Sequence, residues 1–231
     1  MNEIEMNRLM KWVWIVVLVG LFAACGDDGE DKGLDAGYDG VDDQYHEPDG
    51  PGPWILVDLV HASKQNPIDY KMELGVFGYQ GVFAYWRMFE HIQNNGYNTV
   101  FNRDQKLSDD RLEGFDVLFI NLVSDDLPDF TQAERDAIIK FVDQGGGLYV
   151  IVDHTNVYNH AERVNKFLMP MGVEALYHIA TDLPPYYSVA GTAWIMVRSF
   201  ADHPVTEGLG MISLQTGGPT RSESSGVAFT S

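Results

Sequence analysis

The stretch FDVLFINLVSDDLPDFTQAERDAIIKFVDQGGGLYVIVDHTNVY (Phe115–Tyr158) decides the fold class of this chain. Its residues 117–123 are fully apolar apart from Asn121, and a second apolar run, LYVIVD, follows three glycines. Such runs are typical of strands buried on both faces of a parallel sheet. Between them, Thr131 and Glu134 have the spacing of a capping box, which predicts the start of a helix.

The same alternation extends to both sides of this stretch. We expect a first strand over 54–62, a helix that ends at Gly96, a strand over 98–102, and a helix that ends at Pro170. Asn159 and Glu162 repeat the capping-box spacing, and residues 173–180 read as a further strand or an edge piece. The sequence therefore predicts an α/β fold with a doubly wound, mostly parallel, flavodoxin-like sheet of about five strands flanked by helices.

Polar residues follow several of the expected strands. The carboxyl ends of parallel strands form the ligand crevice in sheets of this kind. The candidates for catalysis there are His61, Asp153 and His154, and the candidates for binding are Tyr79, Asp125 and Asn156. Tyr79 lies in a Gly- and Tyr-rich loop that leads into a helix, where an anion could bind or a flat ligand could stack.

No established chemistry fits these candidates fully. There is no Gly-x-Ser-x-Gly elbow, and Thr155 and His154 are adjacent residues of a turn, which rarely face each other. His154 and His160 are six positions apart, which is no recognised metal-ligand spacing. We therefore predict no bound metal and no cofactor. The structural alternative is that Asp153 caps the turn and His154 makes a structural hydrogen bond.

The N-terminus resembles a bacterial export signal. Lys11 is followed by thirteen apolar or small residues and then by Cys25, the single cysteine of the chain. That run is shorter than the about 20 residues that span a bilayer, and it has the length of a secretory apolar region. The residues FAAC resemble a lipobox, with Phe22 in place of the usual Leu. We expect a signal peptide over 1–24 and a lipid such as palmitate on Cys25; a plain signal peptide and an uncleaved anchor are the alternatives.

Charge and composition divide the rest of the chain. Residues 25–53 are rich in Asp and Gly, and we expect a disordered tether there. The formal net charge of −19 argues against nucleic acid as a partner. We expect the folded domain over 54–231 and, because GVAFT reads as the beginning of a strand, a truncated C-terminus. Translation from Met6 instead of Met1 would give a more usual basic leader.

The stretch Phe115–Tyr158 resembles the core of the class I glutamine amidotransferase-like superfamily. In particular, it resembles the non-amidotransferase branch found in bacterial surface, transport and gliding-related proteins. The later ADHPVTEGLG is similar to a His-Pro turn common in these domains. The resemblance implies a cysteine at the turn after the second apolar run, but Asp153, His154 and Thr155 stand there. No catalytic residue carries over from the family.

These observations lead to two expectations of function. The first is a lipid-anchored binding or scaffold domain of the cell envelope, with a small molecule, a glycan or a protein as its partner. Gly26 after the lipidated cysteine would permit export to the outer membrane, facing the periplasm or the surface, in a Gram-negative cell. The second is a hydrolase, with or without a metal, that uses His61, Asp153 and His154.

Overall fold

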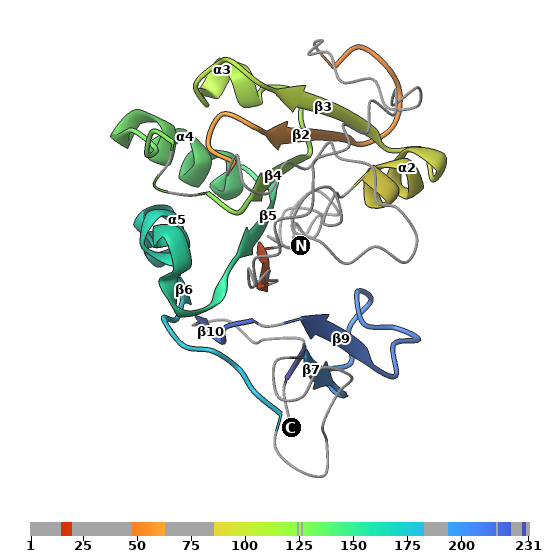
Figure 1. Cartoon of the computed structure of the whole chain (residues 1–231). Coiled ribbons are helices and arrows are strands. Elements are labelled where there is room, and N and C mark those ends of the chain that lie inside the picture. Colours follow the sequence, from red (N-terminus) through yellow and green to blue (C-terminus); the bar gives the residue numbers. More distant parts are fainter. Residues whose placement is uncertain are drawn as a thin grey trace, which may run out of the picture.

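The computed structural model describes residues 15–19, 48–62, 86–123, 125, 127–182, 194–215, 217–222 and 228–229 (Figure 1). Of the predicted site residues, Cys25 and Tyr79 lie outside these ranges, and so do most of the expected leader (1–24) and tether (25–53). The helices and 3-10 turns are α2 Trp86–Asn94, α3 Asp109–Leu112, α4 Gln132–Asp143, η1 His154–Asn159, α5 His160–Leu168 and η2 Met169–Met171.

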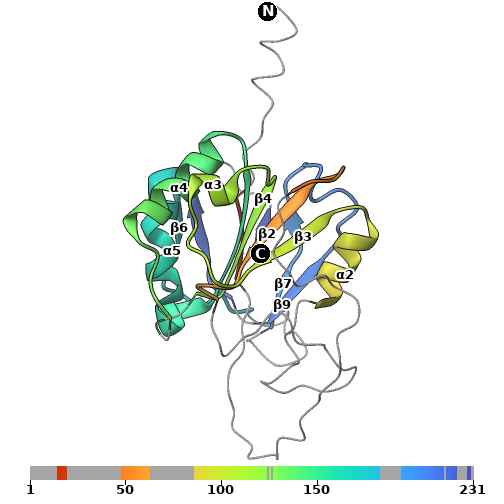
Figure 2. The same ribbon diagram turned by 90° about the horizontal axis from the view of Figure 1, so that it is seen from above.

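The centre of the protein is a five-stranded parallel sheet in the order β1-β5-β4-β2-β3. Its strands are β1 Ile15–Val19, β2 Trp54–Asp58, β3 Asn98–Asn102, β4 Val117–Asn121 and β5 Gly147–Val152. Helices cover both faces: α3, α4 and α5 lie on one side and α2 on the other (Figure 2). The predicted α/β fold with a doubly wound parallel sheet is therefore confirmed.

The direction of winding reverses between β2 and β4. From β2 the chain passes through α2 to β3 on one side, and it then crosses to β4 and β5 on the other side. In open sheets of this type the ligand crevice opens at such a switch point, beyond the carboxyl ends of the strands. An isolated bridge between Ala62 and Val123 ties the two chain segments that leave β2 and β4 there.

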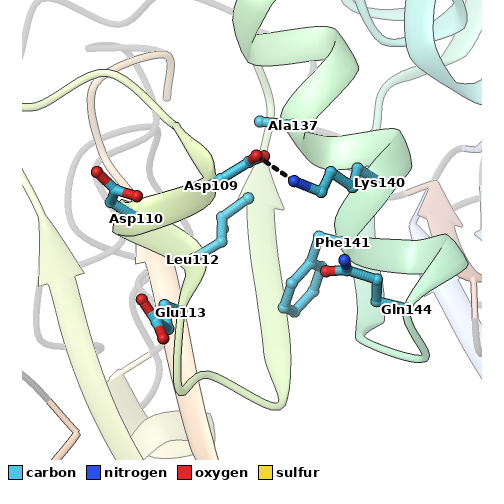
Figure 3. A pocket seen from close by; sticks show the side chains of 8 residues that line it. All are labelled: Asp109, Asp110, Leu112, Glu113, Ala137, Lys140, Phe141 and Gln144. Atoms are coloured by element: carbon cyan, nitrogen blue, oxygen red, sulfur yellow. Dashed lines mark hydrogen bonds and ion pairs between the residues drawn. The ribbon is translucent and has the colours of Figure 1, made fainter.

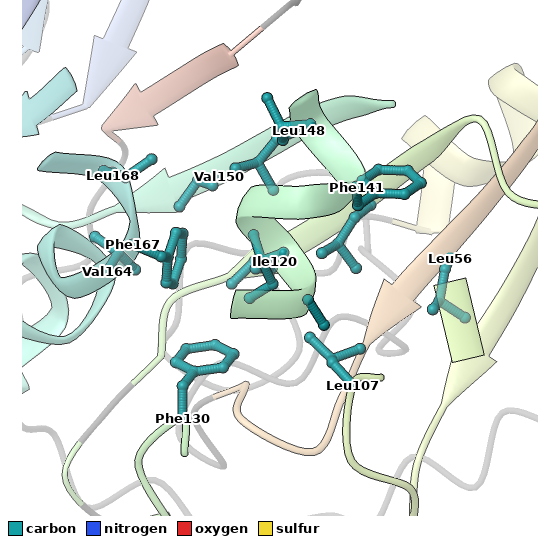
Figure 4. Packing of buried hydrophobic residues seen from close by; sticks show 14 of the residues in the cluster. Leu56, Leu107, Ile120, Phe130, Phe141, Leu148, Val150, Val164, Phe167 and Leu168 are labelled. Carbon is teal, nitrogen blue, oxygen red and sulfur yellow. The ribbon is translucent and has the colours of Figure 1, made fainter. Parts of the chain in front are cut away.

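Two apolar clusters hold the layers together. The larger one joins the sheet to α4 and α5 and includes Leu118, Val150 and Phe167 (Figure 4). The smaller one lies on the α2 face, where Phe89 makes edge-to-face contacts with Phe101 and Phe119. Alternate residues of β2, β3, β4 and β5 enter opposite clusters, as the twofold period of a strand requires. This alternation also sets the face on which each strand-end polar residue lies.

The two predicted capping boxes have different outcomes. At α4, Thr131 and Glu134 form the reciprocal bonds, as predicted. At α5, the prediction for Asn159 is wrong, because the side chain of Asn159 makes no cap bond. The Oδ1 atom of Asn156 accepts the backbone N–H of Glu162 instead, at 2.9 Å. The backbone of Asn159 is left-handed, with φ of 60°, and its amide donates to Asp125.

The edge strand β1 comes from the segment that the sequence assigns to the leader. Residues 15–19 pair with β5 along their whole length, from Ile15 opposite Leu148 to Val19 opposite Val152. Residues 15–19 are thus an edge strand of the parallel sheet, and this strand overlaps the segment in which we expect a leader. None of the described helices is long and apolar enough to cross a membrane.

Short antiparallel pairs follow the main sheet. They are β6 Val173–Ala175 with β10 Thr220–Ser222, β7 Trp194–Val197 with β9 Ile212–Gln215, and β8 Ser199–Phe200 with β11 Ala228–Phe229. The strand predicted over 173–180 is real but ends at Ala175. Residues 176–180 run on as a loop, which contacts the turn after β5 and so contributes to the candidate site.

Candidate binding site at the strand ends

The candidate site lies at the carboxyl ends of β4 and β5. Asn121 is the last residue of β4 and pairs in register with Ile151 of β5, two residues before Asp153. Phe119 and Ile151 belong to the cluster on the α2 face, so strand alternation directs Asn121 and Asp153 to that same face. The two residues are therefore diagonal neighbours beside the switch point of the sheet.

Asn121 is a buried polar group without a partner. Its side chain is 0% exposed, and neither Oδ1 nor Nδ2 makes a hydrogen bond. Leaving a buried donor or acceptor unpaired costs about 1–3 kcal/mol. The next residue, Leu122, has φ of 40°, a strained value for a side chain of its size. The unpaired amide and the strained backbone both lower the stability of the folded state, and no hydrogen bond of the Asn121 side chain offsets this loss.

Asp153 is a buried carboxyl group held by a single hydrogen bond. The backbone N–H of His154 donates to its Oδ1 at 2.6 Å. Burial raises the pKa of Asp153 to about 7, although the His154 N–H partly opposes this shift. Around neutral pH a large part of the molecules therefore carry Asp153 as an uncharged acid, which can donate a hydrogen bond as well as accept one.

His154 lies beside Asp153 but is turned toward its other neighbour. Its Nε2 is 3.8 Å from Asp153 Oδ1, whereas its Nδ1 is 2.7 Å from the Thr155 hydroxyl. Burial lowers the pKa of His154 below its usual value, which favours the neutral ring. The structural alternative for the turn is thus seen, because Asp153 caps the N–H of His154 and His154 makes a local hydrogen bond. The expectation that His154 and Thr155 do not face each other is wrong, since the ring and the hydroxyl are at hydrogen-bond distance.

The turn after β5, which we call the elbow (residues 153–159), has an unusual backbone. Four of its residues are left-handed, with φ between 48° and 60°: Thr155, Asn156, Tyr158 and Asn159. Each such residue other than glycine costs about 1–2 kcal/mol, and β-branched Thr155 is among the least suited to it. Strain of this kind persists where surrounding contacts fix the backbone, and it clusters at functional sites.

Contacts from the loop after β4 fix the elbow. The backbone N–H of Asp125 donates to Tyr158 O at 3.1 Å, and Asp125 Oδ2 accepts from Asn159 Nδ2 at 3.0 Å. Asn156 Nδ2 is 3.4 Å from Asn159 Oδ1. The predicted binding residues Asp125 and Asn156 therefore lie close together, but their side chains hydrogen-bond to Asn159 and hold the backbone of the elbow in place.

A second layer covers the elbow from the C-terminal part of the chain. The N–H of Thr155 donates to His178 O at 3.3 Å, and the N–H of Ala180 donates to Gly217 O at 2.6 Å. Gly218 fits into this layer only because it has no side chain. A Cβ there would lie 2.6 Å from His178 O and 3.6 Å from the Cα of His154.

Gly218→Ala is expected to destabilise the protein by about 1–3 kcal/mol, because the added methyl meets a backbone carbonyl that cannot rotate away. Urea unfolding of both proteins measures the difference. Gly210→Ala is the matched control, since a Cβ at Gly210 meets nothing within 4 Å. Equal losses in the two variants would show that residues 217–219 do not pack on the elbow.

His61 lies in a separate buried network. Its Nδ1 is 2.8 Å from Asp58 Oδ2, its Nε2 is 3.5 Å from Glu134 Oε1, and its ring stacks on Phe130 with centroids 3.9 Å apart. No contact joins His61 to Asp153 or His154 among the described residues. The three catalytic candidates therefore separate into a pair at the elbow and a histidine that packs under α4.

Further polar residues complete the network around His61. Asn102 Nδ2 is 3.4 Å from Asp58 Oδ1, and Asn102 Oδ1 accepts from Arg111 Nη2 at 2.9 Å. Burial by itself would raise the pKa of Glu134, but bonds from Thr131, the charge of His61 and the Leu107 N–H together hold it below the usual value. This network could not be predicted from the sequence, because its members come from four separate segments.

His160 is a second buried group without partners. It is 0% exposed, and neither ring nitrogen makes a hydrogen bond. Burial, with a smaller contribution from the charge of Arg163, lowers the pKa of His160 to about 4, so the ring is neutral at physiological pH. Val164 and Phe167 belong to the larger apolar cluster, and His160 lies on the same side of α5, four and seven positions before them.

A shallow depression of about 290 Å³ lies elsewhere, between α3 and α4 (Figure 3). Its lining includes Asp109 and Lys140, which form an exposed ion pair. Both helices lead into the amino ends of β4 and β5, so this depression lies at the edge of the sheet opposite the elbow. Within the described ranges, no group of three or more His, Cys, Asp or Glu residues could hold a metal ion.

The fold of this chain is similar to that of the mmIFT52 N-terminal domain. The TM-score is 0.52 and the identity 13%, over 76% of this chain and 72% of that domain. A structure from Thermoplasma acidophilum, described as one subunit of a GMP synthase, has 13% identity over 80% of each chain and a TM-score of 0.32. No family model and no curated protein sequence matches the chain. At such identity the first similarity extends to the α/β fold alone.

Proposed function

We propose that this chain is a lipid-anchored domain outside the cytoplasm that binds a small polar ligand at the carboxyl ends of β4 and β5. One observation carries the binding role: Asn121 is fully buried beside the switch point and both of its amide atoms lack partners. The leader-like N-terminus and Cys25 support the anchor. Membership of the non-amidotransferase branch of the glutamine amidotransferase-like superfamily is part of the same proposal.

The absence of a thiol at the elbow supports binding over amidotransfer. The single cysteine, Cys25, is more than one hundred positions away from the elbow in the sequence, and the elbow carries Asp153, His154 and Thr155. The Thr155 hydroxyl contacts His154, but no third group orients that histidine from its other side at hydrogen-bond distance in the described part of the chain. Nucleophilic catalysis requires such an oriented base.

The anchor is tested at the N-terminus of the protein made in a bacterial host. Intact-mass spectrometry is expected to find a chain that begins at a lipidated Cys25, and Cys25→Ser is expected to leave the leader uncleaved and the protein without lipid. A mature wild-type chain that retains residues 15–19 and carries no lipid would contradict the anchor, and it would fit β1 as a permanent strand.

The binding role is tested by thermal stability in a library of small polar compounds. A ligand of the native state raises the melting temperature by an amount that grows with the ratio of its concentration to its dissociation constant. We expect at least one compound to do so for the wild type and not for Asn121→Leu. Compounds that stabilise both proteins equally bind elsewhere, and a library without any hit dependent on Asn121 would refute the site.

One observation favours hydrolysis as a second candidate. A carboxyl group with a pKa of about 7 is suited to proton transfer near neutral pH, and Asp153 has such a pKa. In this alternative Asp153 would donate a proton to the substrate or accept one from water, and His154 would be the second group that takes part in proton transfer. A panel of esters, amides, phosphates and glycosides tests it: turnover that Asp153→Asn abolishes would favour hydrolysis over binding alone.

A further inference from the structure

We propose that the site at the ends of β4 and β5 recognises an uncharged, hydroxyl-rich ligand, namely a neutral saccharide, through Asn121 and Asp153. This inference rests on the proposed binding function and adds the chemistry of the ligand. It follows from the hydrogen-bonding capacity left unused at the strand ends, from the charges around it, and from an aromatic side chain exposed on the elbow.

The two polar side chains offer matched donors and acceptors. The Asn121 amide has an acceptor oxygen and a donor nitrogen, both unused. Asp153 uses Oδ1 for the His154 N–H and, as an uncharged acid, has a hydroxyl left to donate. A sugar hydroxyl is itself both a donor and an acceptor, so adjacent hydroxyls can satisfy an amide and an acid side by side.

Charged ligands fit the site less well. An anion would need a positive partner, yet the pKa of Asp153 is shifted by burial and by one backbone N–H, with no contribution from a nearby cation. A metal cation needs several oxygen ligands, and no cluster of three or more metal-ligating residues occurs in the described ranges. The chain's net charge of −19 also disfavours polyanions.

Tyr158 is an exposed aromatic residue of the same elbow, and its ring centroid lies 5.9 Å from that of His160. Its side chain is 38% exposed, although its left-handed backbone, with φ of 48°, is costly for a bulky residue. The bond from the Asp125 N–H to Tyr158 O fixes that backbone. An exposed ring presents an apolar face and a polar hydroxyl, and the C–H face of a sugar ring packs well on such a surface.

The test is calorimetric titration of the full chain, in a detergent without a sugar headgroup, with neutral glycans of the gluco, galacto and manno series. Glucuronic acid and glucose 6-phosphate serve as charged counterparts. We expect at least one neutral glycan to bind and its charged counterpart to bind at least tenfold more weakly. Asn121→Leu, of similar shape, is expected to weaken binding about tenfold, the factor that about 1.4 kcal/mol of lost hydrogen bonding produces.

The stability of the variants separates recognition from a structural role. Because Asn121 is unpaired, Asn121→Leu is expected to keep or raise the melting temperature while binding is lost. Asp153→Asn keeps a donor and an acceptor and is expected to bind, whereas Asp153→Leu is not. A lower melting temperature for Asn121→Leu, or unchanged glycan binding, overturns the proposal. If no glycan binds but another library compound requires Asn121, the saccharide inference fails and the binding function stands.

Discussion

Asp153→Asn is expected to raise the free energy of unfolding by about 4 kcal/mol at pH 8 and to leave it nearly unchanged at pH 3. Burial raises the pKa of Asp153 from 3.8 to about 7 in the folded protein, so the folded state holds a proton that the unfolded state releases between these values. Stability contributed by this group is therefore complete below the unfolded pKa, falls as the pH rises toward 7, and is constant above it. Asparagine removes that loss because it never ionises.

Urea unfolding of both proteins from pH 3 to pH 9 measures this prediction. The exposed Asp143, the last residue of α4, provides the control variant Asp143→Asn, for which we expect parallel curves. His160 acts in the opposite direction. Its lowered pKa costs stability as the pH falls from 6.5 toward about 4, and this cost cancels between wild type and Asp153→Asn. Curves for Asp153→Asn that stay parallel to the wild type would show that Asp153 is not buried.

Asp58→Ala is expected to cost about 3–5 kcal/mol at pH 7, the range measured when one partner of a buried ionic network is removed. Asp58 is wholly buried and accepts from His61 Nδ1 at 2.8 Å and from the Val60 N–H at 3.3 Å. Its loss leaves the buried ring of His61 without the partner that lies 2.8 Å from its Nδ1.

Chemical denaturation at pH 7 measures the loss. Asp110→Ala is the matched control, because Asp110 is an exposed carboxylate in the first turn of α3. The expected change for Asp110→Ala is within about 0.5 kcal/mol. A loss for Asp58→Ala as small as that of the control would mean that the network around His61 is open to water. An ion pair in contact with water contributes little to stability.

The parts of the fold that local pattern determines could be predicted from the sequence. The apolar runs that became β2, β4 and β5 were recognisable, since a central parallel strand must be apolar on both faces. The helix start at Thr131 was recognisable because the capping box is complete within four residues. The start of α5 was assigned to the wrong residue, because the left-handed backbone of the elbow, which local spacing does not encode, gives the cap to Asn156.

The position of the candidate site in the fold could be predicted from the sequence, but only some of its residues could be. Asp153 and His154 were chosen because they follow an apolar run, and the structure places them at the elbow of β5. His61 was chosen by the same rule, yet it packs against Glu134, a contact made across 73 positions of the chain. Asn121 did carry a signal, as the lone polar residue in its run, but only the packing shows that its amide is unpaired.

The edge strand β1 has a consequence for the order of events in the cell. The segment 15–19 pairs with residues about 130 positions later, so this pairing forms only after β5 has been synthesised. A leader is read when it emerges, long before that point. If the proposed leader is removed first, the sheet assembles with four strands and with β5 at its edge; if the sheet closes first, residues 15–19 are already paired as its edge strand. Under that proposal, the relative speed of leader removal and sheet closure would decide how many strands the mature sheet has.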